Sequence, residues 1–165
     1  MDKKLLNELY QKYYKEIYLY IYSLCRNREI TEDLVQETFL KAILSLSDSH
    51  GNMRAWLYIV ARNLYFNLAK KEKSKIPLDE VKNTPAKELP IIEHIIENER
   101  RRLCFEALQS LRGVKREVLI LQYFGGLSQK EVAAVLHLTP ENVRVLSFRG
   151  KKELRKFMEV NGYDI

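Results

Sequence analysis

Basic side chains near the C-terminal end of the chain are the first residues whose type and spacing suggest a chemistry. They are Arg144, Arg149, Lys151, Lys152, Arg155 and Lys156. On a helix they would lie largely opposite an apolar stripe formed by Val143, Leu146, Gly150, Leu154 and Phe157. Such cations can bind phosphates, although most basic helical faces are simply solvated. This face alone therefore leaves nucleic-acid binding open.

Two capped helices must position these cations. Ser128 and Glu131 have the spacing of a capping box, which marks the start of a first short helix. Thr139 can cap a second helix, with Pro140 at its first position and Glu141 near the positive end of the helix dipole. Two short helices in succession are typical of a helix-turn-helix, and this favours the DNA-binding interpretation.

The second of these helices carries two further features. Val145 and Phe148 accompany the cations on the outward face. Gly150 lies in mid-helix, where glycine costs about 1 kcal/mol relative to alanine. We interpret Gly150 as a packing residue and expect it to lie against the small residues Ala133 and Ala134.

The distribution of charge divides the chain of 165 residues, whose net charge is +6. Residues 1–75 hold 13 Lys and Arg against 9 Asp and Glu, and residues 100–165 hold 13 against 7. Residues 76–99 hold only 2 against 6, and they include the helix breakers Pro77, Pro85 and Pro90. Two basic blocks joined by an acidic linker suggest two separate nucleic-acid contacts.

Several classes of protein find no support in the sequence. Cys25 and Cys104 are far apart and lack neighbouring ligands, so neither a disulfide framework nor a zinc site is expected. His50, His94 and His137 are scattered, and no phosphate loop or catalytic arrangement accompanies them. We therefore predict no catalytic residues, cofactor or metal. With no signal peptide or spanning segment, a cytoplasmic protein is expected.

The N-terminal block begins with a long amphipathic helix that should end near residues 26–28. Its inward stripe is Leu6, Tyr10, Tyr13, Ile17, Ile21 and Leu24. Its tyrosines could stack on bases, but rings with one polar end more often lie at the edge of a core. We therefore expect a core-edge position for Tyr10, Tyr13, Tyr14, Tyr18, Tyr20 and Tyr22.

A second helix should be capped by Thr31, with Glu32 and Asp33 in its first turn. Its buried stripe is Val35, Phe39, Ala42 and Leu46. The opposite face is a ridge formed by Asp33, Gln36, Glu37 and Leu40. Carboxylates and an amide beside an exposed leucine suit a protein partner, although an ordinary acidic surface is the alternative.

A third helix should follow a turn at residues 47–52. Its inward positions are Trp56, Ile59, Val60, Leu64 and Leu68. Its polar positions are Arg54, Arg62, Asn63, Asn67, Lys70 and Lys71. Cations and amides interleaved with aromatic rings suit an opened DNA strand, whose bases can stack or offer their edges. Trp56 has either a core role or a DNA contact. Strand-like alternation is absent, so the fold class expected is all-α.

In this order the segments resemble the sigma-70 family, and within it the small extracytoplasmic-function (ECF) group of bacterial RNA polymerase sigma factors. TEDLVQETFLKA (31–42) resembles the segment that binds the polymerase clamp. RAWLYIVARNLYFNLAKK (54–71) resembles the segment that reads the minus-ten element. GLSQKEVAAVLHLTPENVRVLSFRGKKEL (126–154) resembles the region that reads the minus-thirty-five element. Three motifs in register are specific, and they span nearly the whole chain.

The patterns and the resemblance together imply roles for individual residues. The clamp helices of the beta-prime subunit would bind Asp33, Gln36, Glu37 and Leu40. The minus-ten strand, with one flipped base held by Asn63, would contact His50, Asn52, Arg54, Trp56, Arg62, Asn63, Asn67 and Lys70. The minus-thirty-five element would contact Ser128, Thr139, Glu141, Asn142, Arg144, Val145, Phe148, Arg149 and Lys152.

The resemblance also implies an organisation. Residues 1–75 would form sigma domain 2, residues 76–99 an acidic linker, and residues 100–165 sigma domain 4. The partners would be core RNA polymerase, through its beta-prime clamp helices and beta flap, promoter DNA, and an anti-sigma factor. Where primary sigma factors carry paired tryptophans, this chain has Trp56 and Leu57. The resemblance therefore implies weaker melting of promoter DNA and a stricter requirement for the promoter sequence. The alternatives are a free-standing helix-turn-helix regulator and, less favoured, an enzyme.

Overall fold

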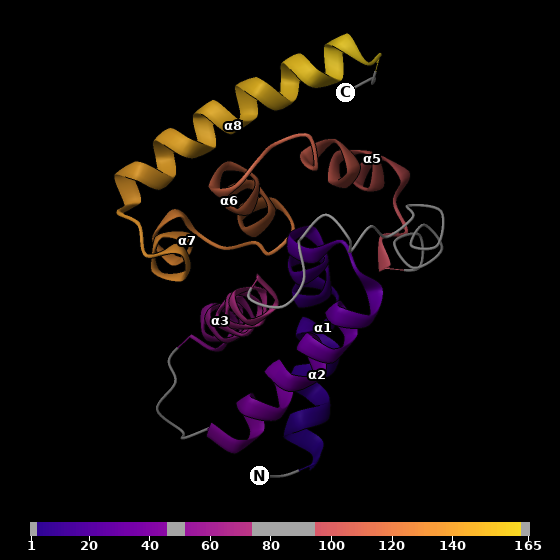
Figure 1. The fold of residues 1–165 in the computed structure, drawn as a ribbon, viewed down its shortest axis with the longest axis vertical. Coiled ribbons are helices and arrows are strands. Elements are labelled where there is room, and N and C mark those ends of the chain that lie inside the picture. Colours follow the sequence, from indigo (N-terminus) through magenta and orange to yellow (C-terminus); the bar gives the residue numbers. More distant parts are fainter. Residues whose placement is uncertain (1–2, 46–51, 74–94, 163–165) are drawn as a thin grey trace. The chain divides into compact units, whose positions relative to one another are not determined.

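The computed structural model describes residues 3–45, 52–73 and 95–162, and all regular structure in these ranges is helical (Figure 1). The chain divides into two compact units, Met1–Leu89 and Pro90–Ile165. No helix in these ranges has the length and apolar character needed to cross a bilayer. Leu46, His50, the three linker prolines and most of the acidic linker lie outside the described residues.

Three helices form the first unit. They are α1 (Lys3–Cys25), α2 (Arg28–Ser45) and α3 (Met53–Lys73), and each packs against the other two (Figure 1). The predicted inward residues Ile17, Ile21, Val35, Phe39 and Ala42 are all buried. Burial of these apolar side chains is the main force that holds the three helices together.

The tyrosines of α1 lie deeper than the sequence predicts. Tyr18, Tyr20 and Tyr22 are fully buried, which agrees with a core position rather than base stacking but places them inside the core and not at its edge. The reason is that α1 packs against both α2 and α3, which covers two of its faces rather than one. Tyr20 meets Tyr58 of α3 edge to face, with ring centroids 5.3 Å apart.

Helix α2 begins earlier than predicted, because Asn27 and not Thr31 provides its cap. The side-chain oxygen of Asn27 accepts a hydrogen bond from the amide of Ile30 at 3.0 Å. Arg26 has a φ of 53°, which ends α1 just before this cap. Thr31 is buried within the helix, and its hydroxyl donates to the carbonyl of Asn27 at 2.6 Å.

Helix α3 is rotated about its axis relative to the prediction. Its buried side chains are Ala55, Leu57, Tyr58 and Ala61. The expected inward residues Trp56, Ile59, Val60, Leu64 and Leu68 are only partly buried. The stripe is displaced because the tyrosines of α1 decide which face of α3 is covered. Tyr58 packs on Tyr20, and the hydroxyl of Tyr65 donates to the carbonyl of Leu24 at 3.1 Å.

Four helices form the described part of the second unit. They are α5 (Glu99–Leu108), α6 (Val114–Tyr123), α7 (Gln129–Leu136) and α8 (Pro140–Val160). Helix α8 packs against α5, α6 and α7 (Figure 1). Phe105, Leu121, Val132 and Val143 are fully buried and come from all four helices. The apolar stripe of α8 therefore faces a shared core, as predicted.

Gly150 is a buried packing residue, but its neighbour differs from the prediction. A Cβ at this position would lie 3.0 Å from Leu119 Cδ1 of α6. The expected contact with Ala133 and Ala134 of α7 is therefore wrong. Helix α7 is short and is tied by Gln129 to the beginning of α8, whereas the middle of α8 lies against α6 at Gly150.

Candidate nucleic-acid interface

The helix-turn-helix has the caps that the sequence predicts. Ser128 and Glu131 form a capping box, in which each side chain accepts the other residue's backbone amide. The hydroxyl oxygen of Thr139 accepts a hydrogen bond from the amide of Asn142 at 3.1 Å. Gln129 of α7 also donates to the carbonyl of Pro140 at 2.9 Å, so the two helices are tied at the point where α8 begins.

These caps leave the two hydroxyl groups available to a ligand. In both residues the oxygen accepts a backbone amide, and a hydroxyl group also has a proton to donate. Ser128 and Thr139 are exposed at the N-terminal ends of α7 and α8. Helix N-termini are favourable positions for phosphate groups because their amides and dipole favour negative charge.

Helix α8 brings its predicted DNA-contacting residues to the surface. The exposed ones are Glu141, Asn142, Arg144, Phe148, Arg149 and Lys152, and Val145 is partly buried beside them. Phe148 is the most exposed ring of the described residues, at 68%. An exposed aromatic ring among cations suits contact with a nucleic acid better than contact with water alone.

Glu141 and Arg144 form an ion pair at the start of α8, with 2.5 Å between Oε1 and Nη2. The hydrogen bond from Arg144 lowers the pKa of Glu141, and the same contact raises the pKa of Arg144. Both side chains are exposed, so the pair adds little to stability. Its consequence is orientation, since Arg144 is held over the first turn of the helix.

A second exposed polar face lies on α3. Asn63, Asn67 and Lys70 are exposed at helical spacing, as predicted. The sequence argument missed Phe66, which shares this face and is 44% exposed. The guanidinium of Arg62 lies 4.5 Å from the centre of its ring. The position of Phe66 three residues after Asn63 was the signal that could have identified it.

The N-terminal end of α3 differs from this face because its predicted DNA-contacting residues have partners within the protein. The side-chain oxygen of Asn52 accepts the amide of Ala55 at 3.1 Å and caps the helix. Arg54 Nε lies 3.0 Å from Glu16 Oε1 of α1. Trp56 is partly buried. His50 lies outside the described residues.

Glu16 is a second residue that the sequence argument missed. The hydroxyl of Tyr58 also donates to its Oε1, at 3.3 Å. Burial raises the pKa of Glu16, and the charge of Arg54 opposes that rise. The pKa of Tyr58 is raised well above its usual range, mainly by burial and to a smaller extent by the nearby Glu16 carboxylate. Only the fold could reveal this cluster, because its members are distant in sequence.

The predicted ridge of α2 is present on the surface. Asp33, Gln36, Glu37 and Leu40 are all exposed, and Leu40 is exposed to 53%. Gln36 and Leu40 also border a hollow of about 650 Å³ between α1 and α2, which we name the α1–α2 hollow. Its other lining residues are Leu6, Asn7, Tyr10, Phe39 and Ile43. The ridge therefore combines carboxylates with an apolar depression.

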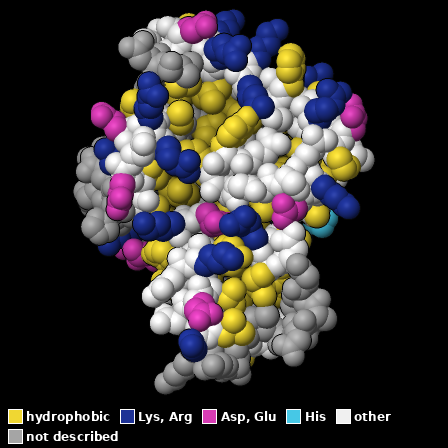
Figure 2. Space-filling model, turned by 180° about the vertical axis from the view of Figure 1, so that it is seen from behind, with side chains coloured by type: hydrophobic (Ala, Val, Ile, Leu, Met, Phe, Trp, Pro, Cys, Tyr) yellow, Lys and Arg dark blue, Asp and Glu magenta, His cyan; other side chains and the backbone are white. Residues whose placement is uncertain are grey.

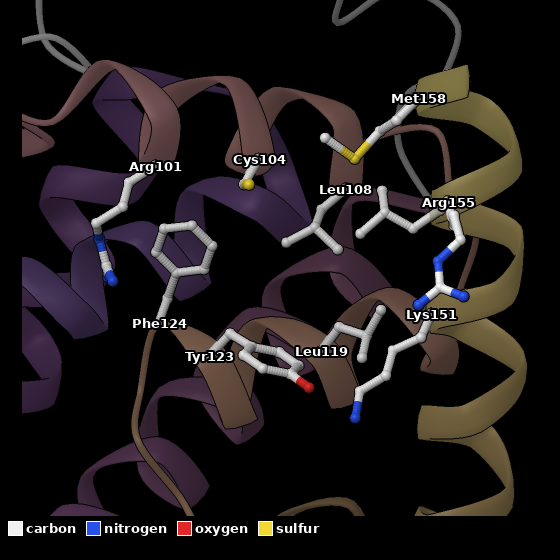
Figure 3. A pocket seen from close by; sticks show the side chains of 10 residues that line it. Arg101, Cys104, Leu108, Leu119, Tyr123, Phe124, Lys151, Arg155 and Met158 are labelled. Carbon is white, nitrogen blue, oxygen red and sulfur yellow. The ribbon is translucent and has the colours of Figure 1, made fainter. Parts of the chain in front are cut away.

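A further hollow of about 370 Å³ lies among α5, α6 and α8, and we name it the α5–α8 groove (Figure 3). Leu108, Leu119 and Met158 contribute to its apolar wall. Arg101, Lys151 and Arg155 also line it. On the second unit, Figure 2 shows yellow apolar side chains surrounded by dark blue Lys and Arg side chains. The groove therefore suits an apolar segment that carries negative charge.

The described ranges hold no group of three or more His, Cys, Asp or Glu side chains that could bind a metal ion. Neither Cys25 nor Cys104 forms a disulfide with a described residue. The fold and surfaces instead define a class of protein. It is an all-α protein with a basic helix-turn-helix in one unit and an exposed cationic, amide-rich helix in the other.

Comparison with known families specifies this class. Residues 9–75 match sigma-70 region 2, and residues 103–154 match sigma-70 region 4. The ECF sigma factor SigM of Bacillus subtilis is 26% identical over 160 residues, which cover 91% of this chain and 93% of SigM. The sigma factor YlaC of the same organism is 29% identical over 161 residues, which cover 93% of this chain and 91% of YlaC. The chain belongs to the ECF group of the sigma-70 family of RNA polymerase sigma factors.

Solved structures confirm the fold. The chain resembles CnrH in its complex with the cytosolic domain of CnrY, with a TM-score of 0.69 and 22% sequence identity. The match covers 96% of this chain and 90% of CnrH. It also resembles RpoE of Bartonella quintana, which was solved with the anti-sigma factor NepR, with a TM-score of 0.67 and 22% sequence identity. This match covers 93% of this chain and 98% of RpoE. The predicted family, all-α fold and sigma-factor function are therefore confirmed.

Proposed function

We propose that this protein divides promoter recognition and polymerase binding among separate surfaces and has no catalytic activity of its own. Residues 1–75 act as sigma domain 2, residues 76–99 as the linker, and residues 100–165 as sigma domain 4. Core polymerase supplies the chemistry of transcription, so the protein works in the cytoplasm. The observation that carries the proposal is the exposed cationic face of α8, in a helix-turn-helix whose two helices are capped by Ser128 and Thr139.

The minus-thirty-five element binds to α8 and to the exposed hydroxyl groups of the two caps. Glu141 and Asn142 lie in the first turn, which is the part of a recognition helix that reaches base edges. Arg149 and Lys152 are exposed farther along the helix and contact backbone phosphates. Phe148 packs against the DNA surface from the same face.

The opened minus-ten strand binds to the exposed face of α3. Asn63 and Asn67 offer amides that can hydrogen-bond the edges of unpaired bases. Lys70 neutralises a phosphate, and Phe66 adds a ring on which a base can stack. Holding an unstacked base in this way offsets the few kcal/mol that unstacking costs.

Core polymerase binds at two places. The clamp helices of its beta-prime subunit contact Asp33, Gln36, Glu37 and Leu40, and an apolar side chain from the clamp enters the α1–α2 hollow. The beta flap occupies the α5–α8 groove, where Arg101, Lys151 and Arg155 pair with its acidic groups (Figure 3). Both surfaces combine an apolar centre with charged borders, as protein interfaces commonly do.

An anti-sigma factor restrains this protein when its promoters are silent. The support for this partner is that one structural relative, RpoE, was solved in complex with the anti-sigma factor NepR, and another, CnrH, in complex with the cytosolic domain of CnrY. The anti-sigma factor competes with polymerase for the surfaces just described, because those surfaces include exposed apolar residues such as Leu40 and Tyr123.

Transcription by core polymerase over a randomised promoter library tests the proposed function. Addition of the protein should enrich promoters that share two elements separated by a fixed spacing. Asn63→Ala should relax selection at one minus-ten position while core binding is retained. If the protein binds DNA but neither retains core polymerase in a pull-down nor directs transcription, it is a free-standing regulator and the proposal fails.

A further inference from the structure

Glu16 of α1 has two partners on α3, in the first part of the helix proposed to bind the minus-ten strand. Its Oε1 lies 3.0 Å from Arg54 Nε and accepts a hydrogen bond from the hydroxyl of Tyr58 at 3.3 Å. Arg54 and Tyr58 are four residues apart, so they lie on the same face of α3. One carboxylate therefore joins two residues in the first part of α3 to α1.

The surroundings of Arg54 restrict its orientation. Its guanidinium lies 5.4 Å from the centre of the Tyr13 ring, and its buried Nε is held by the ion pair with Glu16 and not by a hydrogen bond of good geometry. Nevertheless 37% of the side chain is exposed, against only 16% of Glu16. Among the described residues, neither Nη group has a hydrogen-bond acceptor. The Nε edge is therefore held inside, while the Nη edge remains available to a ligand.

We propose that Glu16 is a positioning residue, which holds Arg54 so that its Nη groups receive a backbone phosphate of the opened minus-ten strand. This inference rests on the proposed function, which assigns Arg54 to that strand. Arginine has many rotamers, and a side chain that is ordered before binding loses less conformational entropy when the ligand arrives. Glu16 thus contributes to DNA affinity without touching DNA.

The test uses the full chain assembled with core polymerase and a fluorescent nontemplate oligonucleotide from a promoter selected in the library experiment. We expect Glu16→Ala to weaken binding about fivefold, the effect of one lost hydrogen bond of ordinary strength. It should also reduce the slope of log binding constant against log salt concentration by about 0.7, the value for one phosphate contact on a single strand. Arg54→Gln should have the same two effects.

Two matched variants separate positioning from general stabilisation. Tyr58→Phe removes the other hydrogen bond to Glu16 but leaves the ion pair, so the salt slope should stay unchanged. Glu16→Gln keeps an acceptor near Arg54 and should restore part of the affinity. In the Arg54→Gln background, Glu16→Ala should have no further effect on binding.

Three results would overturn the inference. Unchanged binding by Glu16→Ala, together with weaker binding by Arg54→Gln, would overturn the role of Glu16 and leave the phosphate contact of Arg54 in place. Tighter binding by Glu16→Ala would mean that the carboxylate competes with DNA for Arg54. A silent Arg54→Gln would overturn both the proposed phosphate contact of Arg54 and the role of Glu16 that depends on it, while leaving the other surfaces of the proposed function intact.

Discussion

At the scale of single residues, the basic side chains of α8 are all exposed but lie against different parts of the surface. Arg149 and Lys152 are exposed on the face that the proposed minus-thirty-five contact uses. Lys151 instead lies 5.3 Å from the centre of the Tyr123 ring and lines the α5–α8 groove. Neighbouring positions on one helix point in different directions, so adjacent basic residues need not share a ligand.

Arg149→Ala should therefore weaken binding to duplex minus-thirty-five DNA and reduce the salt slope by about 0.9, the value for one lost phosphate contact. Arg112→Ala is the matched control, because it removes the same charge from an exposed residue of the second unit that lies outside α8 and outside the α5–α8 groove. Holoenzyme binding to promoter DNA over a series of salt concentrations measures both. Equal slopes in wild type and Arg149→Ala would show that Arg149 makes no phosphate contact.

Glu16 should also affect the pH dependence of stability. Burial raises the pKa of Glu16, so the folded protein holds this proton more tightly than the unfolded chain. The resulting stabilisation is present below the ordinary Glu pKa and is lost as pH rises through the raised pKa of the folded state. Relative to Glu16→Gln, which cannot titrate, wild type should lose stability across that window. Urea unfolding of both proteins at several pH values measures the difference, and parallel curves would contradict it.

At the scale of helices, local sequence rules fixed where the DNA-binding elements begin. The caps at Ser128 and Thr139 join residues three positions apart, and such contacts form wherever the segment is helical. The cap at Asn27 is equally local, and the Asn that precedes Ile30 by three residues could have identified it. Packing between helices follows different rules, as Gly150 demonstrates.

Gly150→Ala should be neutral or stabilise the protein by up to about 1 kcal/mol, the propensity difference between glycine and alanine in a helix. The added methyl would lie 3.0 Å from Leu119 Cδ1, but that atom is the end of a flexible side chain beside the α5–α8 groove, where it has room to move. Gly150→Val should destabilise the protein, since a larger side chain would displace α6. Thermal unfolding compares the three proteins, and a strongly destabilised alanine variant would show that Leu119 cannot move.

At the scale of the whole molecule, each unit presents its own set of exposed surfaces, for which we propose separate ligands. The first unit carries the acidic ridge of α2 and the exposed face of α3, and the second carries α8 and the α5–α8 groove. A substitution on one surface should therefore leave the functions of the others intact. This separation distinguishes a sigma factor from a protein with a single DNA-binding site.

Glu37→Lys tests this separation. Reversal of one charge on the ridge should weaken core-polymerase binding at least tenfold, because a like charge would replace a complementary one at the interface. Glu8→Lys makes the same charge change on the exposed surface of α1 outside the ridge and should have little effect. Titration of labelled protein with core polymerase measures both, and equal affinities would remove Glu37 from the interface.

The sequence by itself determined the fold class, the caps of the helix-turn-helix, the two basic blocks and the family. These features are local or additive, since capping depends on residues three apart and net charge on composition alone. The chain order of the three motifs then gave the family, without any knowledge of how the helices pack.

Only the tertiary structure decided which face of α3 is buried, which residue lies against Gly150 and where Arg54 points. Each of these depends on a contact between helices that are distant in sequence. Leu57 and Tyr58, and not Trp56, are fully buried because the tyrosines of α1 cover that face. Glu16 meets Tyr58 across 42 residues of chain. Helical periodicity indicates that a stripe exists, but several adjacent stripes fit the same residues, and packing against neighbouring helices selects among them.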